Sequence, residues 1–143
     1  EQVAGQSVSQ IFAEAGEPEF RTLETKVLAE LAAYTRLSSA TGGGIILKRE
    51  NWSYLRHGIV VWLDVSLEDI QTRLQGDTTR PLLQAGELSA KLQLLLEQRQ
   101  SLYAQADVRV AYQTGETPEQ VVDQVLEQIR LAIKPEISAS NGK

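Results

Sequence analysis

The chain has 143 residues, of which 42% are hydrophobic, 23% charged and 6% aromatic, a composition typical of one globular domain and not of collagen or extended disorder. Its net charge of −5 leaves no overall basic surface for a nucleic acid or an anionic membrane, and its longest apolar run is far shorter than the ~20 residues of a membrane helix. The absence of cysteine excludes disulfides, thiolate nucleophiles and cysteine-bound metals.

The first predicted elements are two helices separated by a glycine. Ser7 and Gln10 form a capping box that begins a short helix, and Gly16 ends it. Pro18 suits the first helical position of a longer helix, in which apolar residues spaced three and four apart predict one buried stripe. These residues are Phe20, Leu23, Val27, Leu28 and Leu31.

The middle of the chain alternates predicted strands and helices. Residues 37–40 form a short apolar-to-small run that predicts a strand, and the glycine-rich stretch 41–44 predicts a flexible loop after it. A helix is expected over about residues 50–56. The nearly continuous apolar run 59–65 is typical of a parallel strand covered on both faces, and Ser66 is placed to cap the helix that follows.

The last part of the chain opens with a predicted mobile loop. Residues 76–86 are polar, contain a proline and lie between two glycines. A helix over 90–103 and a third strand over 108–111 follow, and a capping box at Thr117 begins an amphipathic helix. The polar residues 134–143 predict a disordered tail.

This alternation of elements predicts one layered α/β domain with a parallel sheet over residues 1–133. Three short strands bury little apolar surface, so we expect further strands N-terminal to this sequence. The chain contains no methionine and opens without a signal sequence, which also indicates that the natural start lies outside these 143 residues.

Common catalytic signatures are missing from the sequence. It contains no GxxxxGK[ST] phosphate loop and no GxGxxG dinucleotide loop, and a single histidine excludes HExxH metal sites. His57 follows a predicted helix, where an interaction with the helix dipole is favoured over a catalytic role. Asp64 has the position of a Walker B acid, but without a Walker A partner we expect it to cap the strand end.

A glycine loop and three arginines are the candidate ligand-binding features. The loop 42–44 follows a predicted strand at the edge where open α/β sheets bind ligands, although a plain flexible turn is an equal alternative. Arg73, Arg80 and Arg99 carry guanidinium groups suited to carboxylate and phosphate oxygens, and a lid carrying Arg80 would close over a phosphorylated ligand. Taken singly, each arginine is more often a solvated surface charge.

Together, these segments resemble shikimate kinase, a small member of the P-loop nucleoside-monophosphate-kinase group. The resemblance runs in the family's order over about residues 1–130, and the stretch 29–65 is similar to cyanobacterial members. Each motif is modest, but the ordered set is specific. The matching segments are GQSVSQIF at 5–12, GEPEFRTLE at 16–24, ATGGG at 40–44 and TRPLL at 79–83, followed by Arg99, Tyr103 and Ala106.

The resemblance implies a three-layer α/β/α parallel sheet of the P-loop kinase type. It also implies transfer of the γ-phosphoryl group of ATP to the 3-hydroxyl of shikimate, with Mg²⁺, in chorismate and aromatic amino acid biosynthesis. Arg21, oriented by Glu24, and Arg99 would hold the shikimate carboxylate. The implied shikimate-binding residues are Arg21, Gly42, Gly43, Gly44 and Arg99, and the implied ATP-binding residues are Arg80 on a lid at about 76–86 and Arg73 beside the adenine.

Family members also have elements that this sequence lacks. Their first strand, their Walker A loop and a second strand with Mg²⁺-binding aspartates would all precede the first residue of this chain. In the family, the first strand lies between those matching residues 37–40 and 59–65. Because the missing Walker A loop and metal site supply most of the positioning and charge stabilisation in phosphoryl transfer, we expect the chain alone to be inactive. Because buried unpaired backbone groups cost about 1–3 kcal/mol each, we also expect it not to form a stable native-like monomer.

Two other functional classes stay open at this stage. One is a non-catalytic, kinase-derived shikimate-binding or regulatory protein, which upstream coding sequence without a Walker A motif would favour. The other is a related small-molecule kinase, such as one acting on gluconate, which the glycine loop and the RPLL stretch make less favoured. For the leading interpretation we expect a cytoplasmic protein, monomeric when complete, with shikimate and ATP as its small-molecule partners and no contact with nucleic acid or membrane.

Overall fold

The computed structural model describes residues 5–75 and 85–133, and the chain divides after Gly58 into two compact units. Unit 1 comprises the described residues up to Gly58, and unit 2 comprises those from Ile59 onward. None of the described helices is both long enough and apolar enough to span a lipid bilayer.

Unit 1 begins with helix α1, Val8–Leu31, which starts and bends as the sequence predicts. The Ser7 side chain accepts a hydrogen bond from the Gln10 backbone N–H at 3.2 Å, and the Gln10 side chain accepts one from the Ser7 N–H at 2.9 Å. Gly16 interrupts the helix with φ 79° and ψ 173°, a conformation that glycine adopts without strain. Pro18 lies in the first turn after this bend.

The rest of unit 1 is helical, and the strand predicted at residues 37–40 is not formed. The short 3₁₀-helix η1, Gly43–Leu47, contains two of the three loop glycines, so the expected flexible loop is partly ordered. Helix α2, Arg49–Leu55, follows and confirms the helix predicted there. Residues 37–40 are exposed and irregular. A strand needs hydrogen-bonding neighbours, and no described strand pairs with this segment.

Helix α1 packs against α2 and against η1, and this packing gives unit 1 a core of its own. The buried apolar side chains come from all three elements. They are Ile11, Leu28, Ile45, Ile46 and Trp52.

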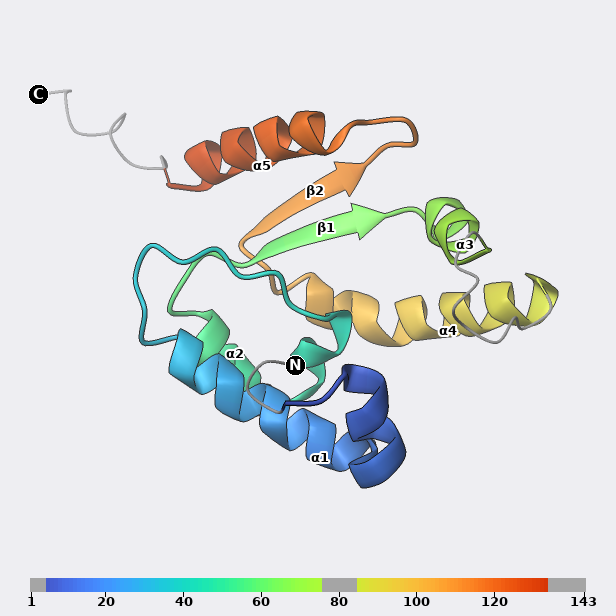
Figure 1. Ribbon diagram of the computed structural model, residues 1–143. Coiled ribbons are helices and arrows are strands. Elements are labelled where there is room, and N and C mark those ends of the chain that lie inside the picture. Colours follow the sequence, from blue (N-terminus) through green and yellow to red (C-terminus); the bar gives the residue numbers. More distant parts are fainter. Residues whose placement is uncertain (1–4, 76–84, 134–143) are drawn as a thin grey trace, which may run out of the picture. The chain divides into compact units, whose positions relative to one another are not determined.

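Unit 2 contains a two-stranded parallel sheet where three strands were expected. Strand β1, Val61–Val65, lies beside strand β2, Val108–Tyr112 (Figure 1). The two pair in a register that aligns Val61 with Val108. The strand at 108–111 is thus confirmed, and β1 is shorter than its apolar run. Leu63 is 51% exposed. The expectation that both faces of this strand are buried is therefore wrong for β1 within the described residues.

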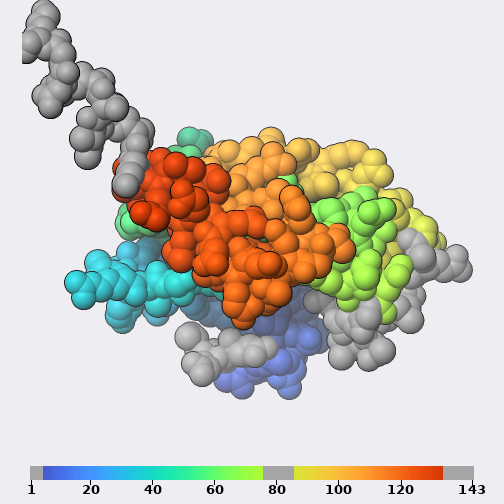
Figure 2. Space-filling view, turned by 90° about the horizontal axis from the view of Figure 1, so that it is seen from above, coloured from blue at the N-terminus to red at the C-terminus, as the bar shows by residue number. Residues whose placement is uncertain are grey.

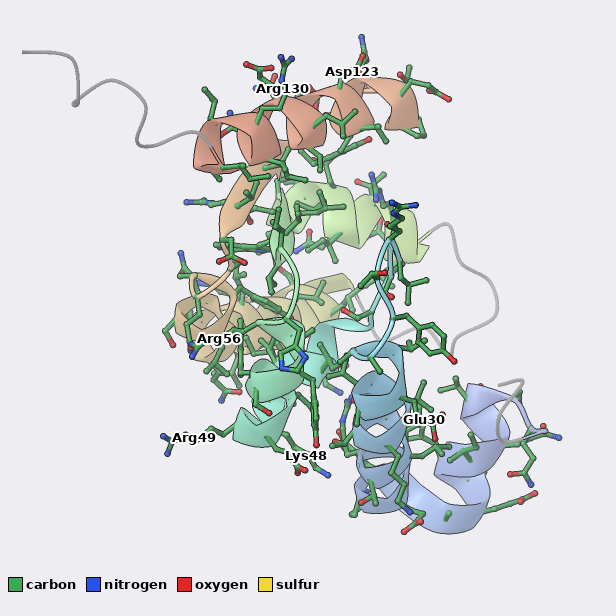
Figure 3. The ribbon with its side chains drawn as sticks, turned by 90° about the vertical axis from the view of Figure 1, so that its left-hand side faces the viewer. Glu30, Lys48, Arg49, Arg56, Asp123 and Arg130 are labelled. Atoms are coloured by element: carbon green, nitrogen blue, oxygen red, sulfur yellow. The ribbon has the colours of Figure 1, made fainter. Side chains whose placement is uncertain are left out.

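Helices flank this small sheet. Helix α5, Pro118–Ile133, packs against β2, and Val108, Val110 and Val121 are buried. Figure 3 shows Asp123 and Arg130 projecting from α5 on the side away from β2. Figure 2 looks onto α5, several of whose apolar side chains stay more than half exposed. These are Val122, Leu126, Leu131 and Ile133.

Local capping signals again define the helix starts in unit 2. Ser66 caps helix α3, Leu67–Gln75, by accepting a hydrogen bond from the Asp69 N–H at 3.1 Å. The Thr117 hydroxyl does the same for the Gln120 N–H at 3.3 Å. Helix α4, Ala85–Tyr103, begins earlier than predicted and includes the last two residues assigned to the mobile loop. The rest of that loop and the predicted tail lie outside the described residues.

Candidate functional site

The most organised cluster of charge in unit 1 is built around Arg21. Arg21 and Glu24 lie three residues apart on α1 and therefore on the same face of the helix. Arg21 Nη1 donates to Glu24 Oε2 at 2.8 Å, and the two side chains are only 18% and 13% exposed. The Arg21–Glu24 pairing predicted from the sequence is present.

A second carboxylate, Glu17, completes the environment of this guanidinium. Arg21 Nη2 and Nε donate to Glu17 Oε1 at 3.2 and 3.3 Å, and the Glu17 side chain is 58% exposed. Partial burial by itself lowers the pKa of Arg21. The hydrogen bonds and charges of Glu24 and Glu17 outweigh that effect, so the pKa is raised above its ordinary value and the group stays charged.

The glycine loop lies directly against this arginine. A Cβ built on Gly44 would lie 2.4 Å from Arg21 Nη2 and 2.5 Å from Nη1, so the guanidinium occupies space that any other residue would fill. A Cβ on Gly42 would lie 3.8 Å from Glu24 Oε1, an ordinary contact. Gly43 begins η1 between them. The structure therefore brings together Arg21, Glu24, Gly42 and Gly44, all of which the resemblance implies for one site.

Two side chains of α2 hold the backbone of η1, and neither was predicted from the sequence as part of the site. Asn51 Nδ2 donates to the Ile45 carbonyl at 2.8 Å, and Trp52 Nε1 donates to the Ile46 carbonyl at 3.1 Å. The only signal in the sequence was that a polar residue, Asn51, and an aromatic residue, Trp52, follow a few positions after the glycines. Such a pair predicts nothing about its acceptors until the fold is known.

The remaining candidate arginines belong to unit 2 or lie outside the described residues. Arg99 lies half-buried on α4, so Arg21 and Arg99 are in different units. Arg73, in the last turn of α3, places its guanidinium 4.5 Å from the centre of the Tyr112 ring at the end of β2. Arg80 falls among residues 76–84, outside the described part of the chain.

Asp64 is neither a strand-end cap nor a free acid. Arg109 on the neighbouring strand β2 donates to its Oδ2 from Nε at 2.8 Å and also from Nη2. The same guanidinium lies 4.8 Å from the centre of the Trp62 ring, which stacks on Tyr103 at 5.7 Å. Asp64 thus serves a cross-strand ion pair. Among residues 5–75 and 85–133, no group of three potential metal-binding side chains comes together.

A second set of polar contacts orders the end of the sheet in unit 2. Asp69 accepts hydrogen bonds from the Ser66 hydroxyl at 2.6 Å and the Thr114 hydroxyl at 2.8 Å. These two bonds, in that order of size, lower the pKa of Asp69 below its ordinary value. The contact with Thr114 ties α3 to the loop after β2. His57, by contrast, is exposed just beyond the end of α2.

Comparison with known proteins assigns this arrangement to a family. The family model for shikimate kinase matches residues 1–130. Shikimate kinase of Nostoc punctiforme is 54% identical over 132 residues, which are 92% of this chain and 73% of that protein. The chain belongs to the shikimate kinase family. The shikimate kinase of Trichormus variabilis is 53% identical over 133 residues, 93% of this chain and 74% of that protein.

Solved shikimate kinases share the fold. The enzyme from Acinetobacter baumannii, determined in complex with shikimate, matches with a TM-score of 0.78 and 36% identity over 95% of this chain and 76% of that one. The enzyme from Bacteroides thetaiotaomicron matches with a TM-score of 0.79 and 27% identity, covering 92% and 77%. The two-stranded sheet and its helices are therefore part of a shikimate kinase fold, and the similarity to cyanobacterial members is confirmed.

Proposed function

We propose that this chain supplies the shikimate-binding part of a shikimate kinase, which transfers the γ-phosphoryl group of ATP to the 3-hydroxyl of shikimate. The observation that carries the proposal is the cluster of Arg21, Glu24, Gly42 and Gly44 in unit 1. It supports a carboxylate-binding role because a charged, half-buried guanidinium is held in one orientation beside a backbone that has no side chain to obstruct a ligand.

The chemistry of the guanidinium fits a carboxylate ligand. An arginine carries five N–H donors, and three of those of Arg21 bond to Glu17 and Glu24. Two donors are left for an incoming carboxylate, which is enough for a bidentate pair. The two glutamates fix the plane of the guanidinium before the ligand arrives, so less conformational entropy is lost on binding.

The remaining roles extend this proposal to the other predicted residues. Arg99 would contribute a second guanidinium to the shikimate carboxylate, and Gly43 would line the hydroxyl side of the ligand with its neighbours. Arg73 would pack beside the adenine of ATP, where its guanidinium already lies over an aromatic ring. Arg80 would reach the ATP phosphates from the lid.

Mg²⁺ does not fit the described residues. No cluster of three carboxylate or histidine side chains exists among them, and Asp64 is engaged by Arg109. The 143 residues also contain no Walker A motif. Because positioning and charge stabilisation supply nearly all the acceleration of phosphoryl transfer, we propose that this chain alone binds shikimate without phosphorylating it.

Calorimetric titration tests the binding part of the proposal. Shikimate is expected to bind saturably, whereas its methyl ester, which lacks the carboxylate charge, should bind at least about tenfold more weakly. Arg21→Lys should weaken shikimate binding by a similar factor, because lysine offers a point charge in place of a planar fork. Arg49→Lys, an exposed arginine on α2, is the matched control. Equal affinities for the acid and the ester would contradict the proposal.

A fusion protein separates a kinase from a non-catalytic binding protein. The second possibility rests on the ordered Arg21 cluster, whose contacts lie entirely within unit 1. In the fusion, the Walker A segment of a cyanobacterial shikimate kinase precedes residue 1. ATP-dependent phosphorylation of shikimate by the fusion, abolished by a Walker A lysine substitution, is expected for the kinase. Shikimate binding without turnover would favour the binding protein, and turnover by the unfused chain would contradict its predicted inactivity.

A further inference from the structure

Two consecutive residues of α2 donate side-chain hydrogen bonds to two consecutive backbone carbonyls of η1. Asn51 Nδ2 lies 2.8 Å from the Ile45 oxygen, and Trp52 Nε1 lies 3.1 Å from the Ile46 oxygen. The last carbonyls of a short helix have no partner within it, so these two bonds replace the ones that η1 cannot make itself. They connect η1 to α2 at its two buried isoleucines, Ile45 and Ile46.

Asn51 is buried with only part of its side-chain amide hydrogen-bonded. The residue is 1% exposed, and its Oδ1 atom has no hydrogen-bond partner among the described residues. Burying an unpaired acceptor is unfavourable, so an apolar side chain of similar size would cost the core less at this atom. The Nδ2 bond to η1 is the hydrogen bond that offsets this cost at the Asn51 side chain.

The segment held in this way is the one that contacts Arg21. Gly44 lies inside η1, and its Cα faces the Arg21 guanidinium so closely that no Cβ fits between them. A shift of η1 by a few tenths of an ångström would open or close this contact. Helix α1, which carries Arg21, packs against both η1 and α2.

We infer that Asn51 and Trp52 are positioning residues for the Arg21 guanidinium, acting through η1 and Gly44. Their side chains donate to the backbone of η1 and act on the guanidinium through it. They fix the position of the Gly44 backbone against which the Arg21 guanidinium packs. They thereby fix the direction of the two N–H donors of Arg21 that are left for a carboxylate. The ligand-binding part of this inference rests on the proposed function, whereas the effect on Arg21 itself does not.

The test combines Trp52→Phe, which removes the indole donor and keeps an aromatic ring, with Asn51→Leu, which removes the amide. The first measurement is the Nε–Hε resonance of Arg21 in the free chain and its rate of hydrogen exchange. Both variants are expected to shift this resonance and to speed its exchange while unit 1 stays folded. Trp62→Phe, in β1 of unit 2, is the matched control and should leave the resonance unchanged.

The second measurement is a double-mutant cycle with Arg21→Lys. Trp52→Phe should weaken shikimate binding about threefold to tenfold in the unsubstituted background, the range of one neutral hydrogen bond. It should have less than about a twofold effect in the Arg21→Lys background, because the group through which it acts is gone.

Each outcome is decisive for the inference. An unchanged Arg21 resonance in both folded variants, or unfolding of both variants, would overturn it, since the two side chains would then serve packing alone. Equal effects of Trp52→Phe in both arginine backgrounds would also overturn it. If the unsubstituted chain binds no shikimate while the Arg21 resonance shifts as expected, the proposed function fails and the positioning role stands.

Discussion

Replacing Gly44 with alanine should displace the Arg21 guanidinium without unfolding unit 1. The new Cβ would lie 2.4–2.6 Å from Nη2, Nη1 and Cζ of Arg21, whereas ordinary van der Waals contact begins at 3.4 Å. The guanidinium must therefore withdraw by about 1 Å. It can do so because it is the far end of a flexible side chain. Gly44 does not have a positive φ, so alanine adds no backbone strain.

The effects of this change on stability and on binding differ in size. Alanine in place of glycine restricts the unfolded chain and stabilises by about 0.4–1 kcal/mol. Weakening the Arg21–Glu24 ion pair costs a similar amount, so the unfolding temperature should change little. Binding has no such compensation. A displaced guanidinium loses a charge-assisted hydrogen bond worth about 1.5–3 kcal/mol, which corresponds to about a 10- to 150-fold weaker Kd for shikimate.

Thermal unfolding and calorimetric titration of the same samples measure both quantities. Gly58→Ala is the control, because a Cβ at Gly58 meets nothing within 4 Å and its φ is not positive. It should leave the Kd unchanged and raise the unfolding temperature slightly, because alanine restricts the unfolded chain in the same way and weakens no ion pair here. An unaltered Kd for Gly44→Ala would refute the reasoning, as would a loss of binding fully explained by unfolding.

Three further predictions concern charge and strand pairing. Glu24→Gln should lower the free energy of unfolding by about 1 kcal/mol in urea titrations, because glutamine keeps an acceptor for Arg21 but loses the charge. Hydrogen bonds led by that from Ser66 depress the pKa of Asp69, so its contribution to stability is complete above the ordinary aspartate pKa of 3.8 and is lost as pH falls through the lower folded value. Unfolding of Asp69→Asn, compared with the unsubstituted chain across that range, should show a difference that disappears in acid, and a constant difference would contradict it. Finally, the predicted lack of a stable native-like monomer should appear as early thermal unfolding of unit 2, where β1 pairs only with β2 among the described residues. Unit 1 has its own core and should unfold separately. A single cooperative melt of both units would contradict this.

Features decided by neighbouring residues could be predicted from the sequence. The capping boxes at Ser7 and Thr117 depend on contacts three residues away, and both are formed. The Arg21–Glu24 pair follows from the same spacing. The bend at Gly16 needs only a residue that tolerates positive φ. In each case the partner atoms lie within one helical turn, so fold-level information adds little.

Features decided by distant partners could not be predicted in this way. Residues 37–40 have the composition of a strand but no described strand beside them, and β propensity alone does not form a ladder. Asp64 took a cross-strand arginine as its partner, and the register that aligns β1 with β2 cannot be read from either segment alone. The bonds from Asn51 and Trp52 to η1 likewise exist only after the chain has folded back.

The most direct test of the central claim is an amide-resolved NMR titration of this chain with shikimate up to millimolar concentration. The account predicts dispersed signals from unit 1 and saturable shifts at Arg21 and at Gly42, Gly43 and Gly44, with smaller or no changes when the methyl ester replaces the acid. Dispersed signals that do not respond to shikimate, or that respond equally to the ester, would show that the Arg21 cluster is not a carboxylate-binding site.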